Sequence, residues 1–141
     1  MTVRLAMYKG KGGPFNALVR WWTGSDYSHC ELEVGGVCYS SSLMDGGVRG
    51  KIIDLGSGNW DLVDLAWADA DLILAHFHRT AHIRYGLTSL IVNQLLNRNR
   101  PDEGAQFCSE WCAAALGLPA PSSLSPATLS AWCMHVTSIY A

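Results

Sequence analysis

The stretch that decides the fold is HCELEVGGVCYSSS, residues 29–42. Its two halves, 29–34 and 37–42, alternate in character and are separated by Gly35 and Gly36. A Gly-Gly pair between such runs is typical of a two-residue β-hairpin turn, because glycine accepts the positive φ that the turn requires. The sequence therefore predicts an antiparallel hairpin in which Val34 pairs with Val37.

Side chains alternate between the two faces of a strand, so this hairpin has an apolar face and a polar face. We expect the apolar face to point into the core; it carries Cys30, Leu32, Val34, Val37 and Tyr39. The polar face carries His29, Glu31, Glu33, Cys38, Ser40 and Ser42. Continued pairing away from the turn places Ser40 opposite Glu31 and Ser42 opposite His29, where a hydroxyl is able to accept the imidazole Nδ1 hydrogen. We interpret Glu31 as solvated or substrate-facing.

The rest of the chain predicts further strands and several helices. Strands are expected over 3–8, 51–55, 59–66 and 135–140, with a loop over 45–50. Helices are expected over 16–22, 69–79, 86–97 and 107–117, and a short one begins at Pro126 with Ser125 as its cap. No internal repeat or linker interrupts residues 1–141, so we predict one α+β domain.

The composition excludes several classes of protein. Apolar residues make up 49% of the chain, charged residues 16%, and the net charge is −2, which predicts a folded domain without a nucleic-acid-binding surface. The N-terminal residues do not form a signal peptide, and no apolar run approaches the roughly 18 residues of a membrane span. We therefore expect the chain to be made in a cytoplasm. Its five cysteines lack the spacing of a disulfide framework, so we expect reduced thiols.

Cys108 lies at the start of the predicted helix FCSEWCAAALG, residues 107–117. A thiol at a helix N-terminus has a lowered pKa, because unpaired backbone N–H groups and the positive end of the helix dipole favour the thiolate. The same N–H groups are able to stabilise an oxyanion. Cys112, one turn further on, is interpreted as a core residue. Together with His29, Cys108 forms a candidate pair of nucleophile and base.

Three histidines, His76, His78 and His82, suggest a zinc site as an alternative, because two of them are four residues apart. The chain contains neither an HExxH motif nor a CxxC pair. We interpret these histidines as residues at a helix end, where the dipole favours them. We predict no metal and no cofactor.

GSDYSHCELEV (24–34) followed by a hairpin, and later FCSEWCAAALGLP (107–119), resemble the circularly permuted branch of the NlpC-type, papain-like cysteine hydrolases. In that branch the histidine strand precedes the cysteine helix, as it does here. The resemblance implies an antiparallel sheet with the nucleophile-bearing helix packed against it. It implies that Cys108 is the nucleophile and His29 the general base. Tyr27 is expected to line the cleft.

The third catalytic position of this family lies on the strand after the histidine and holds His, Asn, Gln or Glu. Alignment of the hairpin turn assigns it to Ser40, and strand pairing offers Ser42 instead. Either serine departs from the family pattern, because a hydroxyl orients an imidazole weakly and does not stabilise an imidazolium as a carboxylate does.

The resemblance implies a cysteine peptidase or amidase that cleaves cell-wall (peptidoglycan) peptides through a thioester. One alternative is a lipid-type acyl ester or amide hydrolase, or an acyltransferase, of the same fold. The other is a non-catalytic structural or binding module, such as a phage tail component. The expected partners are a peptide or acyl substrate, a cell-wall fragment, or the other proteins of a virus particle. Delivery to a cell wall would require a phage particle or a secretion apparatus.

Overall fold

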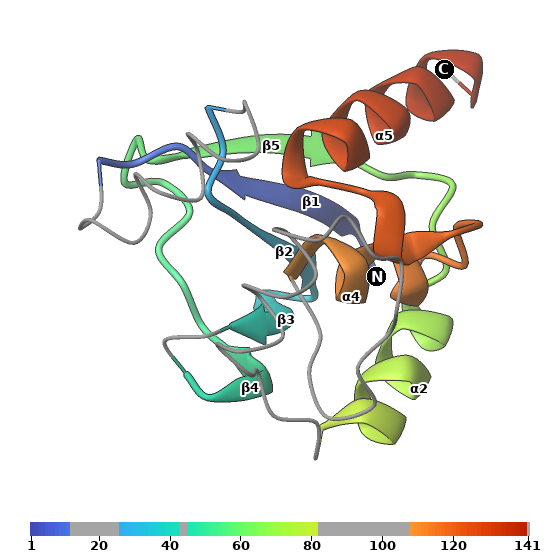
Figure 1. Ribbon diagram of the computed structural model, residues 1–141, viewed down its shortest axis with the longest axis horizontal. Coiled ribbons are helices and arrows are strands. Elements are labelled where there is room, and N and C mark those ends of the chain that lie inside the picture. The colour runs from blue at the N-terminus through green and yellow to red at the C-terminus, as the bar shows by residue number, and fades with distance from the viewer. Residues whose placement is uncertain (12–25, 43–44, 82–107, 141) are drawn as a thin grey trace.

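A five-stranded antiparallel sheet organises the chain, with its strands in the order β4-β3-β2-β1-β5 (Figure 1). The strands are β1 (Val3–Tyr8), β2 (His29–Val34), β3 (Val37–Ser42), β4 (Gly47–Lys51) and β5 (Trp60–Asp64). These elements come from a computed structural model that describes residues 1–11, 26–42, 45–81 and 108–140. The described helices are α2 (Ala70–Thr80), α4 (Cys108–Ala115) and α5 (Pro126–Tyr140), with a short 3₁₀ helix η1 (Pro121–Ser123). The architecture is α+β, as the sequence predicts.

The hairpin of β2 and β3 has the predicted turn. Gly35 and Gly36 adopt φ values of 59° and 89°, which residues with a Cβ atom rarely adopt. The ladder between the strands pairs Val34 with Val37, Glu33 with Cys38 and Leu32 with Tyr39. The expected pairs of Glu31 with Ser40 and of His29 with Ser42 are not part of this ladder. Ser40 and Ser42 pair instead with Arg49 and Gly47 of β4.

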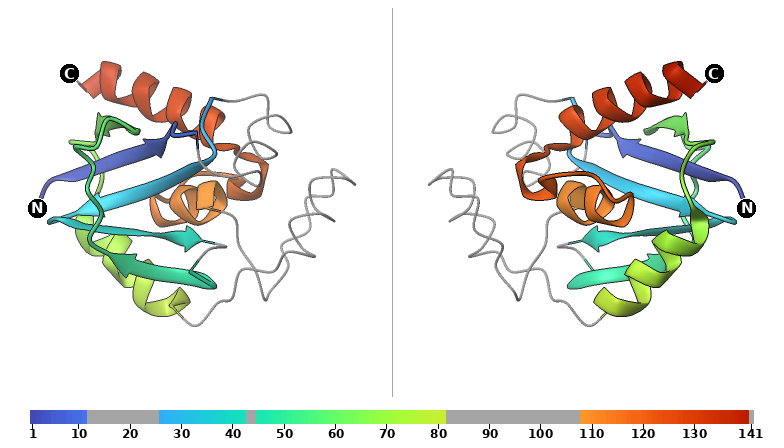
Figure 2. Two further views of the ribbon diagram at one scale, coloured as in Figure 1. Left: turned by 90° about the vertical axis from the view of Figure 1, so that its left-hand side faces the viewer. Right: turned by 90° about the vertical axis from the view of Figure 1, so that its right-hand side faces the viewer.

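One core joins the sheet to the helices. Cys30, Leu32 and Val34 of β2 are buried in it, as predicted, together with side chains from β1 and all three helices. α4 contacts β2 and β3, and it also contacts α2 and α5, between which it lies in every view (Figures 1 and 2). α4 is therefore packed against the two strands of the hairpin.

The ends of the helices follow their capping residues. Asp69 caps α2 by accepting hydrogen bonds from the backbone N–H groups of Asp71 and Leu72. Ser125 caps α5, as predicted, through a bond from the N–H of Thr128 (3.2 Å). Beyond α4, Gly117 adopts a φ of 72°, and the N–H of Leu118 donates to the carbonyl of Ala113. This is the Schellman arrangement that a C-terminal glycine allows.

Two predicted elements are wrong. The strand near residue 50 covers 47–51 rather than 51–55, so most of the expected loop is β4. Residues 135–140, expected to be a strand, are the last turns of α5. The Thr137 hydroxyl donates to the carbonyl of Asp64 and accepts from Trp67 Nε1, and these contacts outweigh the preference of β-branched residues for strands. The helices expected over 16–22 and 86–97 lie outside the described residues.

Among the described helices, none combines the length and the apolar character that crossing a membrane requires.

Candidate active site

The polar face of β2 is buried, which corrects the expectation that Glu31 is solvated. The side chains of Glu31 and Glu33 are 0% and 6% exposed. Each meets an arginine from another strand: Arg4 Nε of β1 lies 2.8 Å from Glu33 Oε2, and Arg49 of β4 contacts Glu31. Glu33 also accepts a bond from the N–H of Gly36. In this setting, cations and N–H groups compensate the buried carboxylates for their lost hydration.

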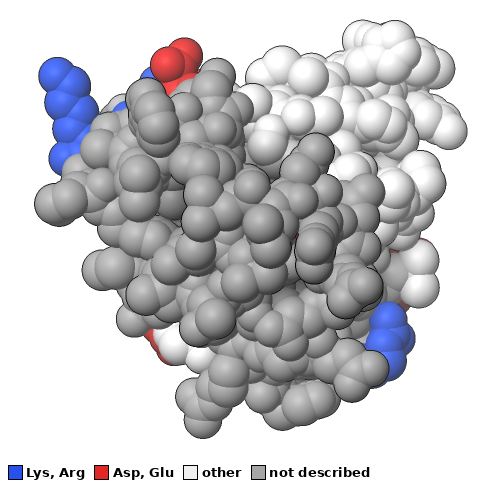
Figure 3. All heavy atoms as spheres, in the orientation of Figure 1, with Lys and Arg blue, Asp and Glu red and all other residues white. Residues whose placement is uncertain are grey.

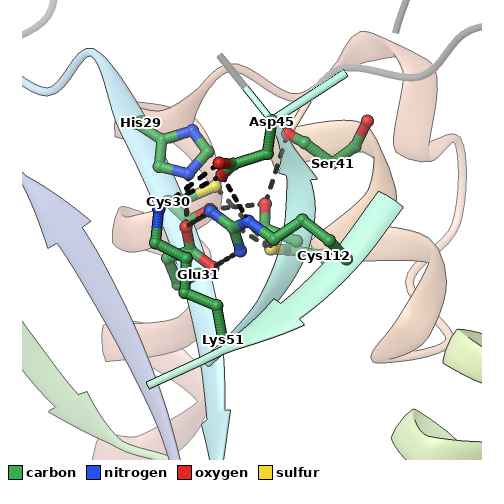
Figure 4. A network of polar contacts seen from close by, with 9 residues as sticks. His29, Cys30, Glu31, Ser41, Asp45, Lys51 and Cys112 are labelled. Atoms are coloured by element: carbon green, nitrogen blue, oxygen red, sulfur yellow. Dashed lines mark hydrogen bonds and ion pairs between the residues drawn. The ribbon is translucent and has the colours of Figure 1, made fainter. Parts of the chain in front are cut away.

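Glu31 is bound on both of its oxygens. Arg49 Nη1 donates to Oε2 at 2.6 Å and Nη2 donates to Oε1, in the forked geometry that a guanidinium forms with a carboxylate. His29 Nε2 lies 2.6 Å from the same Oε1 (Figure 4). Burial alone would raise the pKa of Glu31, but the bonds from Arg49 and His29 outweigh it and hold this pKa below its ordinary value. Glu31 is thus an anion in contact with the His29 ring.

Charges of alternating sign continue from Glu31 to the surface. Arg49 Nε donates to Asp45 Oδ2 at 2.6 Å, and Lys51 Nζ lies 3.4 Å from both oxygens of Asp45 (Figure 4). Side-chain exposure rises along this path, from 0% at Glu31 to 15% at Arg49, 29% at Asp45 and 50% at Lys51. Asp45, at the more exposed end of this network, therefore holds the Arg49 guanidinium in the position in which it binds Glu31.

Cys108 is the first residue of α4 and is 7% exposed. Its pKa lies well below the ordinary value for a cysteine thiol. The largest cause is a hydrogen bond from the Cys30 thiol, which lowers the pKa, whereas burial raises it. The positive charge of His29 lowers the pKa further, as do hydrogen bonds from His29 and from the Cys30 backbone. The thiol predicted as the nucleophile is therefore set up to ionise.

The same arrangement favours the protonated form of His29. Burial lowers its pKa, but the negative charge of Cys108, a hydrogen bond to Cys108 and the bond to Glu31 outweigh burial and raise the pKa to about 10. Since Glu31 occupies Nε2, Nδ1 is the ring nitrogen left for Cys108. The structure thus brings together Cys108 and His29, the two residues that the sequence predicts as partners, in an arrangement that favours a thiolate next to an imidazolium.

Among the described residues, no hydrogen bond joins His29 to Ser40 or Ser42. The Ser40 hydroxyl donates to the carbonyl of Cys30 at 2.7 Å and lies 4.0 Å from Cys112 Sγ. Both serines are buried, and Ser42 ends β3 opposite Gly47. Ser40 thus supports the backbone beside the site, and the position expected for it next to the imidazole is taken by Glu31.

Tyr27 is directed to β5. Its hydroxyl donates to Asp61 Oδ2 at 2.7 Å, and Asp61 also binds Lys9. The bond to Asp61, together with burial and the nearby charges of Asp61 and Asp26, raises the pKa of Tyr27 to about 12. The ring packs against the core, so Tyr27 helps to fix the chain entering β2.

Three residues of the site were missed as such: Glu31 as the partner of His29, Arg49 as the partner of Glu31, and Cys30 as a donor to Cys108. The signal for Glu31 is the His-x-Glu pattern, which places both side chains on one face of a strand. The signal for Arg49 is the presence of Glu31 and Glu33 on one face of a strand, because two such carboxylates need cations from the neighbouring strands. The sequence does not show which strands those are. Nothing in the sequence distinguishes Cys30 from an ordinary core residue.

The described residues contain no group of three or more His, Cys, Asp or Glu side chains that could hold a metal ion. Of the histidines considered as zinc ligands, His76 packs against the Trp111 ring, with the centroids 5.3 Å apart, while His82 lies outside the described residues. The His78 ring is tilted against the neighbouring Phe77 ring on α2, with the centroids 5.5 Å apart.

Comparisons of the chain with protein-family models, with curated proteins and with solved structures give no match.

Proposed function

We propose that the chain is a cysteine hydrolase with a papain-like arrangement, in which Cys108 is the nucleophile, His29 the general acid and base, and Glu31 the residue that orients His29. One observation carries the proposal: the continuous contact from the Cys108 thiol through His29 to the buried, ionised Glu31. A nucleophile, a base and an orienting group in this order form the catalytic unit of acyl-transfer enzymes.

The first half of the reaction forms a thioester. The Cys108 thiolate attacks the carbonyl carbon of an amide or ester, and the N–H groups of the first turn of α4, which lack acceptors within the helix, stabilise the oxyanion. The tetrahedral intermediate collapses when the His29 imidazolium gives its proton to the leaving nitrogen or oxygen. The amine or alcohol departs, and the acyl group stays on the Cys108 sulfur.

The second half releases the acid. Neutral His29 takes a proton from water, the hydroxide attacks the thioester, and collapse of the second intermediate expels the Cys108 thiolate. Glu31 remains ionised throughout, because Arg49 holds both of its oxygens. It keeps the ring in place and stabilises the imidazolium, a role that the predicted serine fills only weakly.

The fold supports the finer assignment to the permuted, NlpC-type branch. The histidine strand precedes the cysteine helix in the chain, and α4 packs on β2 and β3 of an antiparallel sheet. The proposed substrate class, amide bonds of cell-wall peptides, follows from this resemblance. Acyl esters or amides of lipid type, cleaved or transferred by the same residues, are the second substrate class. Access to a cell wall would then involve a phage particle or a secretion apparatus.

One observation favours the alternative of a binding module in a larger assembly. α5 contains no Asp, Glu, Lys or Arg, and the side of it that faces the viewer in Figure 3 is uniformly white. Large apolar side chains of α5 are exposed, namely Trp132, Met134, Ile139 and Tyr140. A protein that only binds through such a surface has no need of an ionised thiol, so the state of Cys108 separates the two candidates.

The deciding experiment measures the rate of iodoacetamide alkylation at each cysteine between pH 5 and 10, by peptide mass spectrometry. We expect Cys108 to react fastest at neutral pH, with an apparent pKa below 9.0 that rises in His29→Ala. Cys38 and Cys133 are internal controls, because burial raises their pKa values to about 11 and about 12. If Cys108 reacts no faster than these two, the catalytic proposal fails.

Activity is then measured on purified peptidoglycan and on p-nitrophenyl acyl esters. Cys108→Ala is expected to abolish product release, while Cys133→Ser, a change at a buried thiol of α5, is expected to retain it. The substrate that is turned over distinguishes the amidase from the acyl ester hydrolase. Release that persists in Cys108→Ala would assign the activity to another group.

A further inference from the structure

Three thiols meet where α4 packs on β2. Cys30 Sγ lies 3.8 Å from Cys112 Sγ, and Cys112 Sγ lies 3.8 Å from the Cys30 carbonyl oxygen (Figure 4). The Cys30 side chain also hydrogen-bonds Cys108. Cys30 and Cys112 are fully buried and Cys108 nearly so, and all are free thiols. The proposed hydrolytic reaction uses only the sulfur of Cys108.

Cys30 and Cys108 differ in their protonation. Burial, followed by hydrogen bonds to Cys108 and Cys112, raises the pKa of Cys30 well above its ordinary value, whereas that of Cys108 is lowered. Cys30 is therefore a protonated thiol that donates to a thiolate. A low-pKa thiolate next to a second thiol is the arrangement found at redox-sensitive cysteines.

We propose that Cys108 is a site of oxidative modification and that Cys30 is its resolving thiol, so that a hydroperoxide converts the two into a Cys30–Cys108 disulfide. This inference rests on the proposed function, because both require Cys108 to be the ionised, reactive thiol. The disulfide removes the nucleophile reversibly, and reduction restores it.

The reaction balances in two steps. The Cys108 thiolate attacks one oxygen of hydrogen peroxide, which breaks the O–O bond, releases hydroxide and leaves a sulfenic acid; the sulfur is oxidised and the peroxide reduced. The Cys30 sulfur then attacks the Cys108 sulfur, and the S–O bond breaks. The Cys30 proton leaves with the departing hydroxyl as water, and the S–S bond remains.

Cys30 fits this role better than Cys112. Cys108 and Cys112 are four residues apart on one helix, where Cβ atoms are about 5–6 Å apart. A disulfide needs Cβ atoms about 3.5–4.5 Å apart, so bridging these two residues would distort α4. Cys30 approaches Cys108 from a different element, so a bridge between these two residues does not have to span one turn of α4.

The test treats the full chain with hydrogen peroxide, blocks free thiols with N-ethylmaleimide and maps the peptides without reduction. We expect one cross-linked species, joining Cys30 to Cys108 and lacking two hydrogens relative to the free thiols. Dithiothreitol is expected to abolish the cross-link and to restore alkylation of Cys108 by iodoacetamide.

Two variants sharpen the result. Cys30→Ser is expected to lose the cross-link, and its Cys108 is expected to proceed to sulfinic and sulfonic acids that dithiothreitol does not reverse. Cys112→Ser, a matched change at the neighbouring buried thiol, is expected to keep the Cys30–Cys108 cross-link. If Cys30→Ser does not fold, the cross-link map of the wild-type chain still decides the question.

The failures of the two proposals are distinguishable. A Cys30–Cys108 disulfide in a chain that hydrolyses nothing overturns the proposed function and leaves the redox site standing. A cross-link between Cys108 and Cys112, or over-oxidation of Cys108 while Cys30 stays a free thiol, overturns the redox site even where the chain is an active hydrolase.

Discussion

Nε2 of His29 lies 2.6 Å from Oε1 of Glu31, two residues further along the same strand. Their backbone positions are roughly 7 Å apart, but both side chains stand on one face of β2 and meet over it. The orienting group of the proposed catalytic unit is thus local in sequence, whereas its nucleophile lies on a distant helix. This contact makes the imidazolium, and through it the Cys108 thiolate, depend on the charge of one buried carboxylate.

Replacing Glu31 by Gln is expected to raise the apparent pKa of Cys108. The amide keeps the shape of the side chain but removes the anion that stabilises the His29 imidazolium, so the ion pair with Cys108 weakens. The alkylation profile of Cys108 should move to higher pH. In the proposed enzyme, kcat/KM should fall by about 10²- to 10⁴-fold, the range for loss of effective acid–base catalysis.

Glu33→Gln is the matched control for this change. Glu33 is a buried carboxylate on the same face of the same strand, and it is also paired with an arginine. Its replacement is expected to lower stability while leaving the alkylation profile of Cys108 unchanged. An equal shift of that profile in both variants would show that the effect is general to the strand and does not arise at His29.

Ser40→Ala is expected to cost about 1 kcal/mol of stability, the net value of one hydrogen bond, because the hydroxyl donates to the Cys30 carbonyl. Urea unfolding measures this cost. The pH dependence of Cys108 alkylation should not change, since Glu31 holds the imidazole. A shift in the apparent pKa of Cys108 comparable to that of Glu31→Gln would instead support the orienting role that the sequence assigned to Ser40.

The elements that could be predicted are those with local signals. The hairpin follows from Gly35-Gly36 and the alternation on either side. The placement of Cys108 follows from the apolar residues of the helix that begins there and from Gly117, which lies just beyond the helix end. His29 and Cys108 could be proposed as partners because each lies at the end of a recognisable element. The two residues come close together because α4 packs on β2 and β3.

The surroundings of Glu31 could not be predicted, because they depend on which strands flank β2 and β3. Arg49 lies in a glycine-rich stretch that was expected to be a loop, and only the pairing of β4 with β3 brings its guanidinium to Glu31. Without this cation, a carboxylate on a strand face is reasonably interpreted as solvated. The last turns of α5 were missed for a similar reason, since Thr137 is held by contacts with Asp64 and Trp67.

Arg49→Met is expected to destabilise the fold by about 3–5 kcal/mol, the cost of leaving a buried charge without its partner. Glu31 loses two hydrogen bonds and Asp45 loses one. Arg4→Met is the comparison, because Arg4 is more exposed (36% against 15%) and makes a single side-chain bond to Glu33. It should cost less, because Glu33 keeps the hydrogen bond from the N–H of Gly36. Equal unfolding midpoints in urea for the two variants would contradict this ranking.

The Cys108–His29 pair is expected to contribute most to stability between about pH 6.5 and about pH 8.5, the ordinary pKa values of the two groups. The folded-state pKa of His29 is raised to about 10, so its contribution is lost as pH rises from 6.5 to about 10. The folded-state pKa of Cys108 is lowered, so its contribution is lost as pH falls below about 8.5. Inside the window the two trends cancel, because the folded and unfolded chains each carry one proton on the pair.

Outside that window stability should fall on both sides. Above about pH 8.5 the unfolded thiol ionises while the folded imidazolium keeps its proton, and below pH 6.5 the unfolded imidazole gains a proton that the folded pair excludes. Urea unfolding of wild type and Cys108→Ala at pH 5.5, 7.5 and 9.5 measures this, and the difference between the two proteins removes the effect of the other buried thiols. That difference should be largest at pH 7.5 and should decline by up to about 1.4 kcal/mol per pH unit on either side. A difference that does not change with pH would show that Cys108 and His29 are uncharged in the folded chain.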